Sequence, residues 1–337
     1  MRERIKQVIK ETFNLDDISD DISQTTCVEW DSMHHLLLVV ALEAEFDISF
    51  EPEDIAVIKS IDEIEKKINS FSGDVQKKEL VEYIPFSTLI EELGIKKGDI
   101  LLVSSDISNL LKKLEHHENI FDPNYIIDKL QEIVGSDGTL LFPTYNWDFC
   151  CGLAFDYYNT PSMTGSLSGA ALKRKDFKRT RHPIYSFAIW GKYQDLLYSM
   201  NNTDSFGIDS PFDFLYKHHG KNLIIDVDYQ SCFTFVHYVE ERVSVAYRYI
   251  KNFSAEYIDE QSKKEEKQFS MYVRNLEMET EVNINPIGEV FEDRGIAIKK
   301  QINNIPFIIV DLYHAFDVIK EDIINNSSKK LTVYKGQ

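Results

Sequence analysis

The sequence has little cysteine, no excess of basic charge and no long hydrophobic run, and each shortage narrows what the protein can be. Its 337 residues contain four cysteines, with no Cys-x-x-Cys spacing, which are too few and too irregular for a disulfide framework: Cys27, Cys150, Cys151 and Cys232. The longest uninterrupted apolar run, Leu36–Leu42, is far shorter than a membrane span, and the N-terminal segment has no secretory hydrophobic region. We therefore expect a cytoplasmic protein with no membrane partner.

Positive charge is also scarce. Lysine and arginine number 37 against 56 aspartate and glutamate residues, for a net charge of −19. This balance argues against a nucleic-acid partner and favours a basic partner or a cationic substrate. Residues 1–75 carry 18 acidic and 7 basic side chains, so a net −11 of that charge is concentrated in the N-terminal fifth of the chain.

No metal site is predicted. Three pairs of adjacent histidines resemble metal ligands at first sight: His34-His35, His116-His117 and His218-His219. Neighbouring residues point in different directions on a helix or a strand, so such pairs are poorly placed to share an ion. His237 and Glu240 stand three residues apart and can share a helical face, but no second ligand motif accompanies them.

The first seventy residues have a helical pattern, with an apolar stripe in the first helix and a polar loop after it. Asp31 is a candidate N-cap for a second helix that would open at Ser32. The free amide groups and the dipole at a helix start would favour a phosphodiester on Ser32. A solvated helix bundle with a capping serine is the alternative interpretation of the same residues.

This segment resembles an acyl carrier protein. The resemblance rests on Asp31-Ser32-Met33 opening a helix, the acidic stretch ALEAEFD, a short segment at Glu51–Ile55 and a last helix at Ile61–Ile68. It implies a small all-α, four-helix carrier domain over residues 1–72 with 4′-phosphopantetheine on Ser32. It also implies two protein partners, a phosphopantetheinyl transferase and an acyl-loading enzyme.

A polar linker over residues 73–84 leads to a larger domain over residues 85–326, and residues 327–337 are predicted to be a frayed tail. Alternating helices and short apolar strands predict a three-layer α/β domain. The strand Ile100–Val103 ends in Ser104-Ser105-Asp106, and the strand Thr139–Phe142 leads to Tyr145. Polar residues just beyond buried parallel strands are where open α/β sheets place their sites.

The stretch RTRHPIYSFAIWG, Arg179–Gly191, holds a histidine before a proline. Pro183 stiffens the turn and disfavours helix at His182, which we therefore expect to be held in the open at a loop-to-strand junction. Neutral imidazole there could take a proton from an amine. A histidine–proline turn without chemistry is the alternative.

The larger domain resembles the aminoglycoside N(3)-acetyltransferase family. Six blocks in order carry the resemblance: LGIKKGDILLVSSD, VGSDGTLLFPTY, TPSMTGSLSGAAL, RHPIYSFAIWG, FGIDSPFDFLY, and TFVHYVEE followed by VAYR. It implies direct acyl transfer from coenzyme A to an amine, with His182 as general base and Asp106 orienting it. Two further sets of residues follow from it: Glu240, His237, Asp209 and Tyr145 for the substrate, and Ser104, Ser105 and Ser186 for the donor. Residues 251–306 receive no predicted role.

Together the two resemblances predict an N-acyltransferase that moves an acyl group from a pantetheine thioester to the amine of a small molecule such as an amino sugar. The donor would be carried on Ser32 or on coenzyme A (acyl-CoA), because the thioester is chemically the same in both. The basic run from Lys173 to Arg181 could dock the acidic carrier helix, or be a solvated face. Two alternatives remain: a coenzyme A-dependent acetyltransferase with an unmodified docking domain, and a non-catalytic carrier or scaffold.

Overall fold

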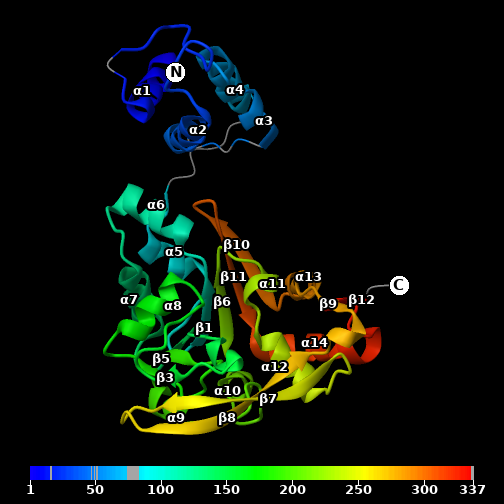
Figure 1. The fold of residues 1–337 in the computed structure, drawn as a ribbon. Helices are drawn as coiled ribbons and strands as arrows, with labels where there is room; N and C mark the ends of the chain where they lie inside the picture. Colours follow the sequence, from blue (N-terminus) through cyan, green and yellow to red (C-terminus); the bar gives the residue numbers. More distant parts are fainter. Residues whose placement is uncertain (16, 47, 49, 51, 74–82, 335–337) are drawn as a thin grey trace. The chain divides into compact units, whose positions relative to one another are not determined.

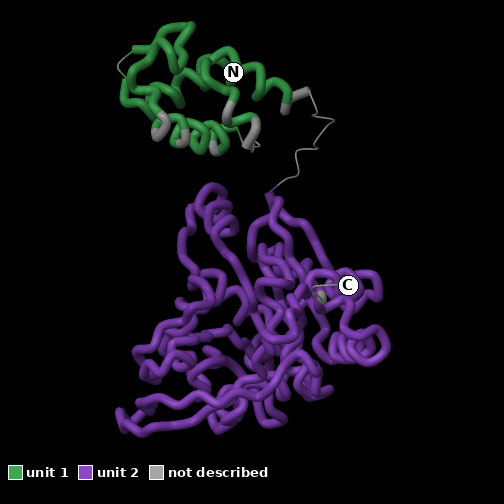
Figure 2. The backbone as a smooth tube through the Cα atoms, turned by 45° about the vertical axis from the view of Figure 1, so that its right-hand side comes forward, with its two compact units in different colours: residues 1–82 green, residues 83–337 purple. Residues whose placement is uncertain are grey.

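The computed structural model describes residues 1–15, 17–46, 48, 50, 52–73 and 83–334. The chain divides into two compact units, residues 1–82 and 83–337, which are described separately (Figure 2). Most of the predicted linker, residues 74–82, lies outside the described residues. Among the described residues, no helix is long and apolar enough to cross a membrane, and no group of three or more His, Cys, Asp or Glu side chains could hold a metal ion.

Four helices make up the described part of the first unit: α1 (Arg2–Phe13), α2 (Ser32–Phe46), α3 (Pro52–Val57) and α4 (Ile61–Gly73). The predicted apolar stripe of α1 is confirmed, because Ile5, Val8, Ile9 and Phe13 are all buried. Burial of that stripe against α2 and α4 stabilises helices that would be marginal alone.

The start of α2 is capped as predicted. The carboxylate of Asp31 accepts a hydrogen bond from the backbone N–H of His34 at 2.8 Å, and its carbonyl oxygen accepts from the N–H of His35 at 2.8 Å. Just before it, the buried indole of Trp30 donates to Nδ1 of His35 at 3.0 Å. These bonds satisfy N–H groups that a helix start otherwise leaves unpaired, and they fix the backbone position of Ser32.

A mixed seven-stranded sheet forms the centre of the second unit, in the order β10-β11-β6-β1-β2-β5-β4 (Figure 1). Its strands are β1 (Ile100–Ser105), β2 (Thr139–Pro143), β4 (Lys178–Arg179), β5 (Phe187–Gly191), β6 (Lys221–Ile225), β10 (Ala297–Ile302) and β11 (Ile305–Asp311). Strand β1 is parallel to both β2 and β6, while β5 and β11 run antiparallel to their neighbours. The three parallel strands therefore end at the same edge.

The two faces of the sheet bury different cores. Along β1, Leu101 and Val103 belong to one apolar cluster, whereas Ile100 and Leu102 belong to another, as the period of two requires. One face is covered by α5 (Phe86–Glu92), α6 (Ser108–Glu118), α7 (Pro123–Val134) and α8 (Ser166–Lys173), and the other by α10 (Pro211–Lys217), α12 (Phe235–Arg242), α13 (Asn285–Asp293) and α14 (Leu312–Asn326) (Figure 1). This matches the predicted three-layer α/β arrangement.

A long hairpin that the sequence pattern did not predict joins the second face. Strands β7 (Arg248–Ile258) and β8 (Lys264–Arg274) pair along their whole length, and β3 (Phe155–Asp156) adds a short parallel strand. The remaining elements are short: α9 (Gln194–Ser199), α11 (Tyr229–Cys232), β9 (Thr280–Val282), β12 (Thr332–Tyr334) and the 3₁₀ turns Asp148–Cys151 and Leu276–Met278.

The prediction of a frayed tail from residue 327 is wrong for its described part. Strand β12 pairs antiparallel with β9, and Leu331 is fully buried in the core beneath α14. The apolar side chain of Leu331 and the ladder hydrogen bonds of β12 hold this segment against the domain.

Candidate active site

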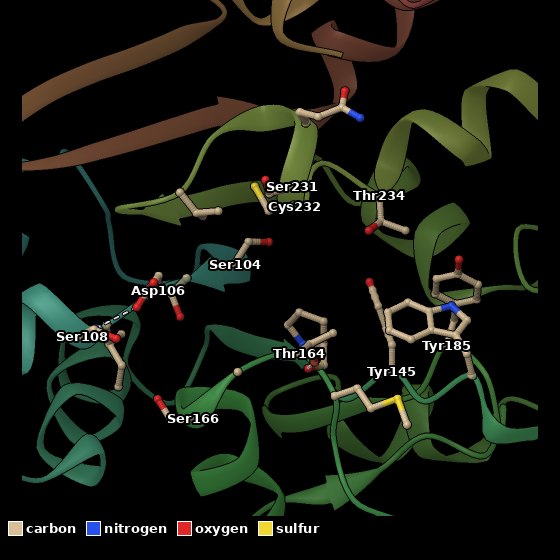
Figure 3. Close-up of a pocket in the computed structure, with 18 of the residues that line it drawn as sticks. Ser104, Asp106, Ser108, Tyr145, Thr164, Ser166, Tyr185, Ser231, Cys232 and Thr234 are labelled. Atoms are coloured by element: carbon tan, nitrogen blue, oxygen red, sulfur yellow. Dashed lines mark hydrogen bonds between the residues drawn. The ribbon is translucent and has the colours of Figure 1, made fainter. Parts of the chain in front are cut away.

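A cavity of about 570 Å³ opens at the edge where the three parallel strands end (Figure 3). Nineteen residues line it: Ser104, Ser105, Asp106, Ile107, Ser108, Pro143, Tyr145, Trp147, Met163, Thr164, Gly165, Ser166, Tyr185, Val227, Gln230, Ser231, Cys232, Thr234 and His237. The first five follow or finish β1, Pro143 finishes β2, and Val227 lies just past β6. The cavity therefore occupies the position at which open α/β sheets bind ligands.

His237 is the titratable base of this cavity, and a buried carboxylate orients it. Its Nδ1 lies 2.7 Å from Oε2 of Glu240, one helical turn further along α12. Because an ionised carboxylate only accepts hydrogen bonds, Nδ1 carries the proton and Nε2 is left with the lone pair. Nε2 has no hydrogen-bond partner among the described residues.

Glu240 is fully buried and held from two further sides. Nε of Arg248, at the start of β7, lies 2.7 Å from the same Oε2, and the hydroxyl of Tyr247 donates to Oε1 at 2.9 Å. Burial alone would raise the pKa of Glu240, but His237, Arg248 and Tyr247 together outweigh it and leave that pKa lowered. Glu240 is therefore an anion that fixes the tautomer and the orientation of His237.

The pKa of His237 lies below its usual value. Burial lowers it most, Arg248 lowers it further, and the nearby Glu240 raises it in part. His237 is consequently neutral at pH 7, which is the state a general base requires.

One end of the cavity is rich in hydroxyl groups and receives two helix N-termini (Figure 3). The first turn of α6 contributes Ser108, whose N–H donates to the carboxylate of Asp106 at 2.9 Å. The first turn of α8 contributes Gly165 and Ser166, and no side chain caps that helix. Gly165 has a φ of 95°, a conformation that L side chains rarely adopt, and an added Cβ would lie 3.4 Å from the carbonyl oxygen of Ser105. The carboxylate of Asp106 already occupies the start of α6, whereas the uncapped start of α8, with the positive end of its dipole, is suited to anionic or carbonyl oxygen.

The other end of the cavity is aromatic. The rings of Tyr145 and Tyr185 lie 4.7 Å apart in an edge-to-face arrangement, and Trp147 lies 6.4 Å from each of them. Phe206 connects this wall to the base, because its ring is 4.9 Å from Tyr185 and 5.6 Å from His237. The imidazole therefore stands beside the aromatic end.

The prediction that His182 is held in the open is wrong. Its side chain is 1% exposed, and it does not line the cavity. Nδ1 accepts from the backbone N–H groups of Tyr185 and Ile184 at 3.1 and 3.3 Å, and the ring lies edge-to-face on Phe269. Burial lowers the pKa of His182 to about 3. The ring closes a turn from inside the core, so the geometry favours the structural alternative over a base.

Asp106 does not orient a histidine. It lines the cavity, but its carboxylate faces the start of α6, and hydrogen bonds from Ser108 lower its pKa. Asp209 is exposed and does not line the cavity. The geometry therefore gives neither residue its predicted contact with the base or the acceptor.

The predicted donor residues divide into two groups. Ser104 and Ser105 line the cavity, and the hydroxyl of Ser104 donates to Asn222 at 3.2 Å. Ser186 is fully buried away from it, where its hydroxyl donates to the carbonyl oxygen of Thr144 at 2.8 Å and accepts from Arg179 at 3.0 Å. Tyr145 lines the cavity as predicted, and Glu240 reaches it through His237.

Several cavity residues had no predicted role. Trp147 and Thr164 lie between β2 and α8, and Ser166 begins α8; Arg248, outside the cavity, completes the Glu240 cluster. The His-x-x-Glu spacing of His237 and Glu240 carried the signal that could have identified this pair, because it places the two side chains on one helical face.

The basic run lies apart from this cavity. Lys173, Lys175 and Lys178 line a separate groove of about 490 Å³ beside the edge strand β4. Arg174 is paired with Asp128 and Asp176, so part of the positive charge of the run is already neutralised.

Comparison with known proteins identifies the class. The profile of the aminoglycoside 3-N-acetyltransferase family matches residues 103–323, and the chain belongs to that family. The protein is therefore an N-acyltransferase, and the scaffold alternative is set aside.

The relatives are distant. The SPbeta prophage-derived aminoglycoside N(3′)-acetyltransferase-like protein YokD of Bacillus subtilis is 25% identical over 265 residues, which cover 72% of this chain and 92% of the relative. The crystal structure of YokD matches with a TM-score of 0.57 at 23% identity, over 71% of this chain and 97% of that one. AAC-VIa bound to sisomicin matches with a TM-score of 0.60 at 17% identity, over 71% and 96%. AAC-IIIb with coenzyme A matches with a TM-score of 0.59 at 17% identity, over 71% and 95%. These structures support the mixed α/β fold.

Proposed function

We propose that the protein transfers an acyl group from a pantetheine thioester directly to the amine of an amino sugar, with His237 as the general base. The observation that carries this proposal is the 2.7 Å contact between His237 and the buried Glu240 at the aromatic end of the cavity. The proposal assigns the role of general base to His237, whereas the sequence predicts His182 in that role. Glu240 is a positioning residue in this scheme.

The thioester supplies an electrophilic carbonyl carbon and a thiolate leaving group. The lone pair on Nε2 of His237 takes the proton of the attacking amine as the C–N bond forms, and the same proton can pass to the sulfur as the C–S bond breaks. A positioned base of this kind contributes about 10²–10⁴ to the rate, and holding both reactants in one cavity contributes much of the remainder.

The donor fits the hydroxyl-rich end of the cavity. The N-terminus of α8 can hold phosphate or carbonyl oxygen there, while Ser104 and Ser105 offer hydroxyl partners to the amides of a pantetheine arm. AAC-IIIb has been solved with coenzyme A, which supports coenzyme A as one donor.

The second donor in our proposal is 4′-phosphopantetheine on Ser32, loaded by a phosphopantetheinyl transferase and an acyl-loading enzyme. Support comes from Ser32 at the start of α2, the Asp31 cap and the acidic charge of residues 1–75. Intact mass after coexpression with a broad phosphopantetheinyl transferase tests it. A gain of one phosphopantetheine that disappears in Ser32→Ala supports a carrier role, and no gain leaves coenzyme A as the donor.

The choice of base is tested by product formation with an acyl-CoA donor and an amino-sugar acceptor. His237→Gln should lower kcat by about 10²–10⁴ with little change in KM. The control is His314→Gln, an exposed histidine on α14, which should leave kcat unchanged. Equal activity of His237→Gln and the control would refute the assignment.

A further inference from the structure

The cavity carries little negative charge. Among the described residues that line it, Asp106 is the one carboxylate, and hydrogen bonds from Ser108 already engage it. Glu240 is fully buried and shared between His237, Tyr247 and Arg248. Most of the chain's excess acid, a net −11, belongs to residues 1–75.

This charge distribution is poorly matched to a polycation. An aminoglycoside carries several ammonium groups, and each one removed from water without a carboxylate partner costs several kcal/mol. The cavity offers instead neutral hydroxyl groups, those of Ser231 and Thr234, which suit the hydroxyls of a sugar.

The aromatic end adds a surface for an apolar face. Trp147 is 40% exposed although Tyr145 and Tyr185 hold its ring, and Met163 beside it is 47% exposed. Large apolar side chains held rigidly at a cavity mouth gain free energy when a ligand covers them. His237 lines the same cavity, and Phe206 links its ring to Tyr185, so a sugar that rests on this wall shares one cavity with the imidazole.

We infer that the acceptor is a monoamino sugar, with a single amine on an otherwise uncharged ring, whose apolar face rests on Trp147. This inference rests on the reaction proposed above and narrows its substrate. The net negative charge of the whole chain acts over long range and does not supply the local partners that several ammonium groups would need.

Isothermal titration calorimetry on the full chain tests the inference without turnover. The probes are three methyl hexosides (2-amino-2-deoxy, 3-amino-3-deoxy and 4-amino-4-deoxy), a uridine diphosphate-linked 2-amino-2-deoxy sugar, and sisomicin. At least one monoamino sugar should bind more tightly than sisomicin at physiological salt. Comparing the methyl hexosides with the nucleotide-linked sugar tells which of the two forms the site accepts. Tighter binding of sisomicin than of every monoamino sugar, or no binding by any of them, would overturn the inference.

Variants locate the contact. Trp147→Ala should weaken binding of the preferred sugar about five- to tenfold, while Trp147→Phe keeps most of it. Tyr158→Ala is the matched control, because Tyr158 is 67% exposed and lies outside the cavity. Met163→Glu should tighten sisomicin binding, since it adds the missing carboxylate. Equal effects of Trp147→Ala and Tyr158→Ala would contradict the stacking role.

Kinetics separate this inference from the proposed reaction. A monoamino sugar that binds but is not acylated would refute the reaction and leave the inference about binding intact. Acylation of sisomicin with a higher kcat/KM than that of any monoamino sugar would support the proposed reaction and overturn the inference about the acceptor.

Discussion

Replacing Glu240 by glutamine tests whether the charge of Glu240 fixes the tautomer of His237. The change keeps the shape of the side chain and removes the charge that now faces Nδ1 of His237 and Nε of Arg248, each at 2.7 Å. A glutamine amide can turn its NH₂ toward Nδ1, which would move the ring proton to Nε2 and remove the lone pair that the amine needs. In a comparable His–Asp pair the equivalent change costs about 10⁴ in kcat, so we expect a loss of about 10³–10⁴.

The same change also affects stability, because it leaves the guanidinium of Arg248 without its counter-charge in a buried position. Breaking one side of a buried pair costs about 3–5 kcal/mol. The double variant Glu240→Gln/Arg248→Met removes both charges and should recover much of that loss while staying inactive. Stability follows from urea denaturation, and kcat from product formation at saturating acceptor.

These two readouts distinguish positioning from folding. Glu240→Gln with kcat within threefold of the native enzyme would refute the tautomer argument. Recovery of kcat in the double variant would show that the loss came from instability alone. Tyr247→Phe removes one hydrogen bond and keeps the charge pair, so it should cost about tenfold at most.

Three further outcomes are expected. Because the pKa of His237 is lowered, its neutral form persists below pH 6.5, so the acid limb of the kcat profile that disappears in His237→Gln should lie below that value. The pKa of His182 is about 3 in the folded protein, so below pH 6.5 the unfolded chain binds a proton that the folded chain refuses. As the pH falls below 6.5, this group should lower the free energy of unfolding by about 1.4 kcal/mol per pH unit. Urea titrations at several pH values should show that the free energy of unfolding depends less steeply on pH in His182→Gln. An equal pH dependence in the two proteins would contradict the burial argument. Leu331→Ala should lower the free energy of unfolding by about 2–5 kcal/mol, whereas Val333→Ala, half exposed two residues further on in β12, should lower it by under about 0.5 kcal/mol; equal thermal shifts would mean that Leu331 does not anchor this segment to the core.

Local patterns predicted much of the fold. The strands expected at Ile100–Val103 and Thr139–Phe142, as short apolar runs before polar residues, are present as β1 and β2 and extend one or two residues further. The hairpin β7–β8 was missed because most of its side chains on both faces are charged or exposed, so neither an alternating nor a continuous apolar pattern marks it.

The burial of His182 and the ion pair of His237 were missed for a different reason. A histidine before a proline predicts a turn, but the sequence does not tell whether the turn faces solvent or the core, and neighbours distant in sequence such as Phe269 decide that for His182. The aromatic wall and the hydroxyl-rich end likewise combine residues from separate loops, which periodicity cannot bring together. The His237–Glu240 spacing was visible, but the sequence alone did not show that Arg248 and Tyr247 would keep Glu240 ionised.

The ion pair between Glu240 and Arg248 constrains one end of the hairpin and leaves the other end unconstrained. Arg248 stands at the base of β7, opposite Arg274, while the turn after Ile258 lies at the far end of the eleven-residue strands. The end of the hairpin that carries Arg248 must keep its geometry for the imidazole of His237 to stay oriented. The turn at the other end can lengthen, shorten or change its charges without affecting the carboxylate of Glu240. The hairpin is thus a part on which related enzymes could acquire new surface properties while the proton-transfer geometry stays constant.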